Sequence, residues 1–161
     1  MDIKAVLLDT SFIIRLLSDS DELHENAKAY YKHFLDCGVD MKFSTISIAE
    51  YCVRGNVSEL PLRNLKIIPF NFDHAQRAGL FAAKVYSARN GGQLPEIKER
   101  LFIPNDTKLF SQADLDSSIQ YFVTSDTKSK NVITLLCGEC GARLQHLDIH
   151  TPVNEFFGEL F

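Results

Sequence analysis

Short apolar runs alternate along the chain with longer amphipathic segments. The runs are rich in β-branched and aromatic residues, and their alternation with helical patterns is typical of an α/β fold. The first run, AVLLD, is apolar throughout until its aspartate, as expected of a parallel strand that is buried on both faces. The predicted strands are 5–9, 42–46, 65–70, 121–125 and 143–149.

The segments between these runs predict amphipathic helices. In 22–38 apolar residues recur at helical spacing, and Gly38 suits a left-handed cap at the helix end. In 72–92 we expect Asp73 to be the N-cap and the closing glycine pair to end the helix. Further helices are predicted at 12–18, 48–55, 106–118, 128–137 and 152–160.

The least regular segment is 93–105, which has a proline near each end and no clear period. It is predicted to be an ordered loop or insertion that overhangs the candidate site. The chain has no internal repeat, low-complexity tract or flexible linker. With 161 residues and a hydrophobic fraction of 45%, it is predicted to form a single domain over residues 1–161.

The net charge of −4, from 17 basic and 21 acidic residues, does not provide the strong basic field of many nucleic-acid-binding proteins. Two bound Mg²⁺ ions would cancel this excess, so the charge does not exclude such a substrate. No apolar stretch is long enough to cross a membrane, and the first residues do not resemble a secretory signal. We therefore expect a cytoplasmic protein with free thiols at its four cysteines.

Four acidic residues lie where ligands bind in sheets of this kind, beyond the carboxyl ends of parallel strands. Asp9 closes the first predicted strand, and Asp126 follows the fourth. Glu50 lies just past the second strand, and Asp106 opens the helix that precedes the fourth. Each acid has a structural explanation as well, because Asp9 and Asp126 suit N-caps and Asp106 suits a first helical turn.

Glu50 has such an explanation too, since Ser47-Ile48-Ala49-Glu50 has the form of a capping box. Four carboxylates in one crevice, however, would repel each other unless a cation or a proton compensated their charge. The four acids together therefore predict one metal site.

Four segments resemble the acidic motifs of PIN-domain nucleases such as VapC-like toxins: LLDTSF (7–12), STISIAEY (44–51), PNDTKLFSQAD (104–114) and YFVTSD (121–126). The resemblance runs through most of the chain. It implies a three-layer α/β/α sandwich with a parallel five-stranded sheet of order 3-2-1-4-5. It also implies metal-dependent hydrolysis of RNA phosphodiester bonds, frequent homodimers, and an antitoxin protein as partner of a toxin.

The sequence departs from this family in two places. The stretch 90–104 is longer than in compact members, and Asp114 and Asp116 stand where small apolar residues are common. Either aspartate is an alternative to Asp106 as the third ligand, and we prefer Asp106.

The acids Asp9, Glu50, Asp106 and Asp126 are thus predicted to be both catalytic and metal-binding. One or two Mg²⁺ or Mn²⁺ ions suit them, because hard cations prefer carboxylate oxygens and no histidine or cysteine accompanies these acids in sequence. One ion would lower the pKa of a nucleophilic water, and a second would stabilise the departing 3′ oxygen. No organic cofactor is expected.

Candidate RNA-binding residues lie near these acids: Thr124, Arg54, Lys108, Lys128 and Lys130, with Arg15 also near the expected mouth. Arg54 follows Glu50 by four residues, so on a helix it would share that face and either bind a phosphate or pair with Glu50. Thr124 suits either the orientation of substrate or water or simply a strand. Lys128 and Lys130 either bind the RNA backbone or form a solvated face.

Three other interpretations were weighed. Cys137, Cys140, His146 and His150 include zinc-binding residue types, but the interval between the cysteines and histidines is too short for a zinc finger. Phosphoryl transfer at Asp9 is disfavoured because Ser11 stands where a dehalogenase-like site has a second aspartate. A PIN-like module that binds RNA or protein without turnover remains the alternative to a ribonuclease.

Overall fold

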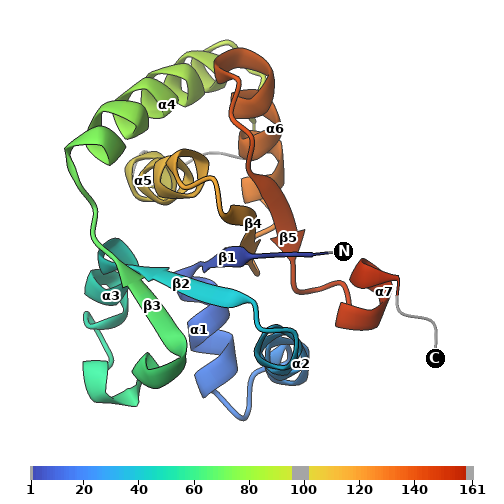
Figure 1. Ribbon diagram of the computed structural model, residues 1–161. Helices are drawn as coiled ribbons and strands as arrows, with labels where there is room; N and C mark the ends of the chain where they lie inside the picture. Colours follow the sequence, from blue (N-terminus) through green and yellow to red (C-terminus); the bar gives the residue numbers. More distant parts are fainter. Residues whose placement is uncertain (1, 96–101, 159–161) are drawn as a thin grey trace.

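A computed structural model describes residues 2–95 and 102–158. Its centre is a sheet in which every pair of neighbouring strands is parallel. The strand order is β3-β2-β1-β4-β5, which confirms the predicted order 3-2-1-4-5 (Figure 1). The strands are β1 (Ala5–Leu8), β2 (Asp40–Ser44), β3 (Leu65–Ile68), β4 (Ile119–Thr124) and β5 (Gln145–Asp148).

Helices cover both faces of the sheet and complete the predicted three-layer α/β/α sandwich (Figure 1). On one side lie α1 (Thr10–Leu17), α2 (His24–Asp36) and α7 (Val153–Phe157), with α3 (Thr45–Tyr51) packed beside α1. On the other side lie α4 (Phe72–Asn90), α5 (Phe102–Leu115) and α6 (Ser129–Cys140). Two short 3₁₀ helices, Val57–Glu59 and Leu62–Asn64, connect α3 to β3. No described helix has the length and apolar character of a membrane span.

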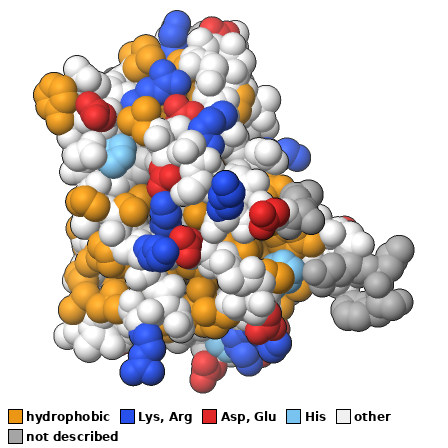
Figure 2. Space-filling model, in the orientation of Figure 1, with side chains coloured by type: hydrophobic (Ala, Val, Ile, Leu, Met, Phe, Trp, Pro, Cys, Tyr) orange, Lys and Arg blue, Asp and Glu red, His pale blue; other side chains and the backbone are white. Residues whose placement is uncertain are grey.

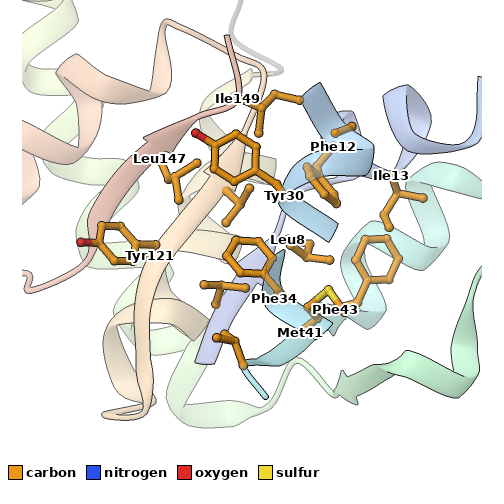
Figure 3. Packing of buried hydrophobic residues seen from close by; sticks show 14 of the residues in the cluster. Leu8, Phe12, Ile13, Tyr30, Phe34, Met41, Phe43, Tyr121, Leu147 and Ile149 are labelled. Atoms are coloured by element: carbon orange, nitrogen blue, oxygen red, sulfur yellow. The ribbon is translucent and has the colours of Figure 1, made fainter. Parts of the chain in front are cut away.

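Two hydrophobic cores form because successive strand residues point to opposite faces of the sheet. Val6 and Leu8 of β1 pack in the first core, which holds the large rings of Tyr30 and Phe34 from α2 (Figure 3). Ala5 and Leu7 of the same strand pack in the second core, against residues of α4, α5 and α6. Burial on both faces explains why β1 is an uninterrupted apolar run in the sequence.

The start of α3 differs from the prediction. The helix begins at Thr45 rather than at residue 48, and Ser44 is its N-cap, accepting a hydrogen bond from the Ile46 amide at 3.0 Å. The capping box predicted for Ser47 and Glu50 is therefore wrong, and the helix ends at Tyr51 rather than at residue 55. Glu50 lies in the last turn of α3, where it has no capping role.

The third acidic segment also differs from the prediction. Helix α5 begins at Phe102, so residues 102–105 of the predicted loop are helical, and the helix ends at Leu115 rather than at 118. Pro104 is its third residue, a position where a missing amide proton costs no helical hydrogen bond. Residues 96–101 of the predicted loop lie outside the described residues, so the structure does not bear on an overhang there.

The ends of the other helices lie closer to their predicted positions. Gly38 has the left-handed conformation predicted for the end of α2, with φ of 66°. Helix α7 ends at Phe157, before Gly158, rather than at residue 160. The N-cap of α4 is Asn71 instead of Asp73, because the Asn71 side chain accepts from the His74 amide while the His74 ring accepts from the Asn71 amide. Asp73 lies in the first turn of that helix.

This corrected N-cap gives a test of the fold. We expect Asn71→Ala to lower the free energy of unfolding by about 1 kcal/mol, because the amides at the start of α4 lose their acceptor. Asp73→Ala should cost only a few tenths of a kcal/mol through the helix dipole. Thermal unfolding followed by circular dichroism compares the two variants. A greater loss in Asp73→Ala than in Asn71→Ala would contradict the assignment.

Candidate active site

Each of the four predicted acids follows or neighbours the carboxyl end of a strand. Asp9 comes directly after β1, and Asp126 lies just past the end of β4. Glu50 is on α3, the helix that follows β2, and Asp106 is on α5, which leads into β4. Because β1 lies between β2 and β4, the topology carries these segments to one edge of the sheet.

Asp106 has the most perturbed carboxyl group of the four. Burial raises its pKa well above the ordinary range, and the negative charges of Asp9, Asp126 and Glu50 raise this pKa further. Asp106 is the fifth residue of α5, so it lies beyond the first helical turn that was expected to account for it. The other three acids therefore act electrostatically on Asp106, and the first turn of its own helix does not account for its position.

Asp9 is buried, and its carboxylate is held by two hydroxyl groups. The hydroxyl groups of Ser11 and Thr124 donate to Asp9 Oδ2 at 2.9 and 2.7 Å. Burial raises the pKa of Asp9 and the charge of Asp126 adds to the rise, whereas the two hydroxyl groups oppose it by stabilising the ionised form. The backbone of Asp9 has the N-cap conformation of α1, but its side chain makes no capping hydrogen bond.

Glu50 is a half-buried acid with an unusual lack of partners. Burial raises its pKa, the charge of Asp9 raises it further, and the charge of Lys108 opposes this shift. Among the described residues, the buried atoms Glu50 Oε1 and Thr10 Oγ1 make no hydrogen bond of ordinary geometry, although the Thr10 hydroxyl lies close enough to Glu50 to lower its pKa slightly against the effect of burial. A buried carboxylate oxygen without a donor is unfavourable unless something else binds to it.

Asp126 combines a turn role with its place at the site. Its Oδ1 accepts a hydrogen bond from the Lys128 amide at 2.9 Å, so the side chain shapes the turn into α6, whose N-cap is Lys128. The Asp126 amide donates to Thr124 Oγ1 at 2.9 Å. The Asp126 carbonyl oxygen lies 3.3 Å from Nε2 of His146. Asp126 therefore has a structural role in the turn before α6, as predicted, although the N-cap of that helix is Lys128.

The two alternative third ligands are engaged elsewhere. Asp114 accepts hydrogen bonds from Arg77 Nε and from the Arg143 amide, each at 2.9 Å. Asp116 is paired with the ammonium group of Lys42, which holds the pKa of this half-buried carboxyl below its ordinary value against the opposing effect of burial. Neither aspartate contributes to the pKa shifts of Asp9, Glu50 or Asp106. This placement favours Asp106 as the third acid.

The side chains of these acids are not arranged as a ready-made ligand set. In residues 2–95 and 102–158, no group of three or more His, Cys, Asp and Glu side chains is placed to hold one metal ion. The same finding removes support from the zinc interpretation of Cys137 and Cys140, and all four cysteines are free thiols, as expected. His146 lies against a backbone carbonyl oxygen, and His150 Nδ1 lies 2.7 Å from Asp148 Oδ1.

The predicted RNA-binding residues have different surroundings. Arg54 lies beyond the end of α3, so it does not share a helix face with Glu50 as predicted, but both residues line an open hollow of about 660 Å³. Lys108 is half-buried and acts on Glu50, whereas Lys128 and Lys130 are exposed.

Two further residues are placed differently from the sequence expectation. Arg15 is held by both carboxylate oxygens of Asp21, at 2.9 and 3.0 Å. Thr124 is fully buried and bonded to Asp9, so its position does not support direct contact with RNA.

On the face of the molecule shown in Figure 2, basic and acidic side chains are intermixed, and neither sign of charge forms a separate patch.

Sequence reasoning missed Ser11 as a residue of the site. The sequence drew attention to it only as a residue that disfavours a dehalogenase-like centre. Its position two residues after Asp9 was the available signal, because a hydroxyl at that spacing can reach back to the same carboxylate. Its second contact, with the backbone after β4, depends on the pairing of β1 with β4.

Two solved structures share this architecture over most of the chain. VapBC2 from Rickettsia felis, bound to a DNA fragment from its promoter, matches with a TM-score of 0.58 and 19% identity, over 89% of this chain and 99% of the matched chain. The chain has the PIN-like fold of VapC proteins. VapC20 from Mycobacterium tuberculosis, a toxin that cleaves the sarcin–ricin loop, matches with a TM-score of 0.53 and 17% identity. The match covers 76% of this chain and 90% of the VapC20 chain. No protein-family model and no curated protein matches the sequence, so the PIN-like fold rests on structural similarity.

Proposed function

We propose that this chain is a metal-dependent endoribonuclease and the toxin of a toxin–antitoxin pair. The observation that carries the proposal is the half-buried Asp106 at this end of the sheet, whose pKa is raised by burial and by the charges of Asp9, Asp126 and Glu50. Repelling carboxylates at the carboxyl edge of a parallel sheet destabilise the fold unless a cation compensates them. The PIN-like fold supports the same conclusion.

Asp9, Glu50, Asp106 and Asp126 would hold one or two Mg²⁺ or Mn²⁺ ions. The donor set suits these ions, because all four side chains offer carboxylate oxygens and hard cations prefer oxygen ligands. The buried Oε1 of Glu50, which has no partner among the described residues, fits a cation as its missing neighbour. When bound, the metal would lower the pKa of a water molecule and polarise the scissile phosphodiester.

The basic residues around the acids would bind the RNA backbone. Arg54 is exposed in the hollow that also contains Glu50, where its guanidinium group can pair with a phosphate. Lys128 and Lys130 are exposed beside Asp126, at the start of α6. Contacts of this kind position a nucleic acid without reading its sequence. Loss of either lysine should therefore weaken RNA binding without abolishing the chemistry.

A single-stranded or loop RNA is the expected substrate, because its splayed bases leave phosphodiester bonds accessible. The similarity to a toxin that cleaves the sarcin–ricin loop makes this loop a suitable first substrate. The similarity to a VapBC structure also supports an antitoxin protein as partner, and the family resemblance supports a homodimer. Co-purification of a small second protein with the tagged chain would test the antitoxin partner, and light scattering would test the dimer.

The test of the function is cleavage by the purified protein. Structured RNAs, including a sarcin–ricin loop, are incubated with Mn²⁺ or Mg²⁺ and the cut ends are mapped. We expect cleavage by the parent protein and a loss of more than about 100-fold in Asp9→Asn and in Asp126→Asn, because each removes a ligand charge. Ser129→Ala serves as the control, since its buried hydroxyl has no hydrogen-bond partner among the described residues. Cleavage that persists in both asparagine variants would refute the mechanism.

A second candidate function is a PIN-like module that binds RNA or protein without turnover. The observation that favours it is the lack, within the described residues, of a ready-made group of metal ligands. Such a module would retain RNA binding in a filter-binding assay while showing no hydrolysis with either cation.

A further inference from the structure

Two hydroxyl groups converge on one oxygen atom of Asp9. Ser11 Oγ lies 2.9 Å and Thr124 Oγ1 lies 2.7 Å from Asp9 Oδ2. The two hydroxyl groups come from segments that are distant in the sequence, since Ser11 is near the start of α1 and Thr124 is the last residue of β4. Both hydroxyl groups bond to Oδ2 of this carboxylate, and neither bonds to Oδ1.

Each of the two hydroxyl oxygens also accepts a hydrogen bond from a backbone amide. The Ser125 amide donates to Ser11 Oγ at 3.1 Å, and the Asp126 amide donates to Thr124 Oγ1 at 2.9 Å. An ionised carboxylate only accepts, so each hydroxyl group directs its single proton to Asp9 Oδ2 while its oxygen accepts from a backbone amide. The two oxygen atoms, 3.2 Å apart, then need no proton between them. Both hydroxyl groups therefore connect the Asp9 carboxylate to the turn that carries Asp126.

These hydrogen bonds oppose the electrostatic repulsion between Asp9 and Asp126. Asp9 and Asp126 are both acids, and the charge of Asp126 acts unfavourably on Asp9. Without a restraint, a carboxylate beside like charges rotates away from them, and a metal ligand with a free rotamer binds its ion more weakly. Two donors on Oδ2 fix the carboxylate and stabilise its negative charge.

We infer that Ser11 is a positioning residue of the proposed metal site. Its hydroxyl, together with that of Thr124, fixes the Asp9 carboxylate through Oδ2 and couples it to the Ser125–Asp126 backbone, so that Asp9 would be oriented to hold the cation. The inference rests on the proposed function, because it concerns the binding of the same ion. Ser11 itself does not contact the ion or the RNA.

The test measures Mn²⁺ affinity directly, by isothermal titration calorimetry, in the full-length protein. We expect Ser11→Ala to weaken Mn²⁺ binding by about 10- to 100-fold, the range found when a partner behind a metal ligand is removed. Ser129→Ala removes a buried hydroxyl of equal size from outside this network, and we expect it to bind Mn²⁺ like the parent protein. In the cleavage assay, Ser11→Ala should lower kcat while the KM for RNA remains unchanged.

A second pair of variants separates the hydroxyl from packing. Ser11→Thr and Ser11→Val have nearly the same shape and differ in the hydroxyl group, so we expect tight Mn²⁺ binding in the first and weak binding in the second. Equal Mn²⁺ affinity in this pair would overturn the inference and leave the proposed function intact. A parent protein that binds no Mn²⁺ would instead overturn the proposed function, and the inference with it.

Discussion

Replacing Asp106 with asparagine should stabilise the metal-free protein and abolish the proposed metal-dependent activity. The carboxylate is half-buried within reach of the charges of three other acids, and burial and these charges raise its pKa well above the ordinary value. Asparagine removes this charge at nearly constant volume. We expect the free energy of unfolding to rise by roughly 1 to 3 kcal/mol, the usual cost of an uncompensated buried group, which raises the Tm by about 2–4 °C per kcal/mol.

The same substitution removes a proposed metal ligand, so cleavage of RNA should fall by more than about 100-fold. Calorimetry in EDTA measures the first effect, and the cleavage assay with Mn²⁺ measures the second. Asp114→Asn is the matched control on the same helix. Its carboxylate is buried but paired with Arg77, so its loss should lower the Tm. A fall in Tm for both variants would contradict the proposed repulsion at Asp106.

The stability of the metal-free protein should decrease as the pH rises through the range in which the site acids ionise. The pKa values of Asp9, Glu50 and Asp106 are all raised, chiefly by burial. Between the unfolded pKa of about 4 and these raised values, the folded protein holds more protons than the unfolded chain. The contribution of these acids is therefore fully present below about pH 4 and is lost as the pH rises through their folded pKa values.

Other titratable groups stabilise the folded protein as the pH rises. The test therefore compares the Tm of a variant with the Tm of the parent protein. Burial lowers the pKa values of His74 and His146, which favours the folded protein as the pH rises towards about 6.5. The difference in Tm between Asp106→Asn and the parent protein cancels these histidines. In EDTA this difference should be near zero at about pH 4 and should grow with pH. Excess Mn²⁺ should reverse the trend, because ligands bind the ion in their deprotonated form. A difference that does not change with pH would rule out the raised pKa of Asp106.

The arrangement of strands and helices followed from the sequence because burial leaves a direct pattern. Strand β1, which is enclosed on both faces, is a continuous apolar run, and the predicted positions of all five strands agree with the structure to within a few residues. The sheet order came from the family resemblance. The helix ends were harder, because several residues can cap one helix. Ser44 and Ser47 are both suitable caps by type, and only the hydrogen bond to the Ile46 amide decides between them.

The candidate site was predictable as a set of acids but not as a geometry. The positions of Asp9, Glu50 and Asp126 after strands and of Asp106 at a helix start identified all four, and the family motifs supported the same set. The competition between Asp106, Asp114 and Asp116 depends on which basic side chains lie nearby. The pairs with Arg77 and Lys42 join residues that are distant in the sequence, so no local pattern predicts them.

The four acids belong to segments that begin near residue 9 and end near residue 126, and the β1–β4 pairing joins the first of them to the last. A chain still emerging during its synthesis therefore has no complete set of carboxylates until most of it has been translated and β4 has paired with β1. Folding that requires contacts between such distant segments is slow. The proposed nuclease site would therefore form only on a chain that is nearly complete.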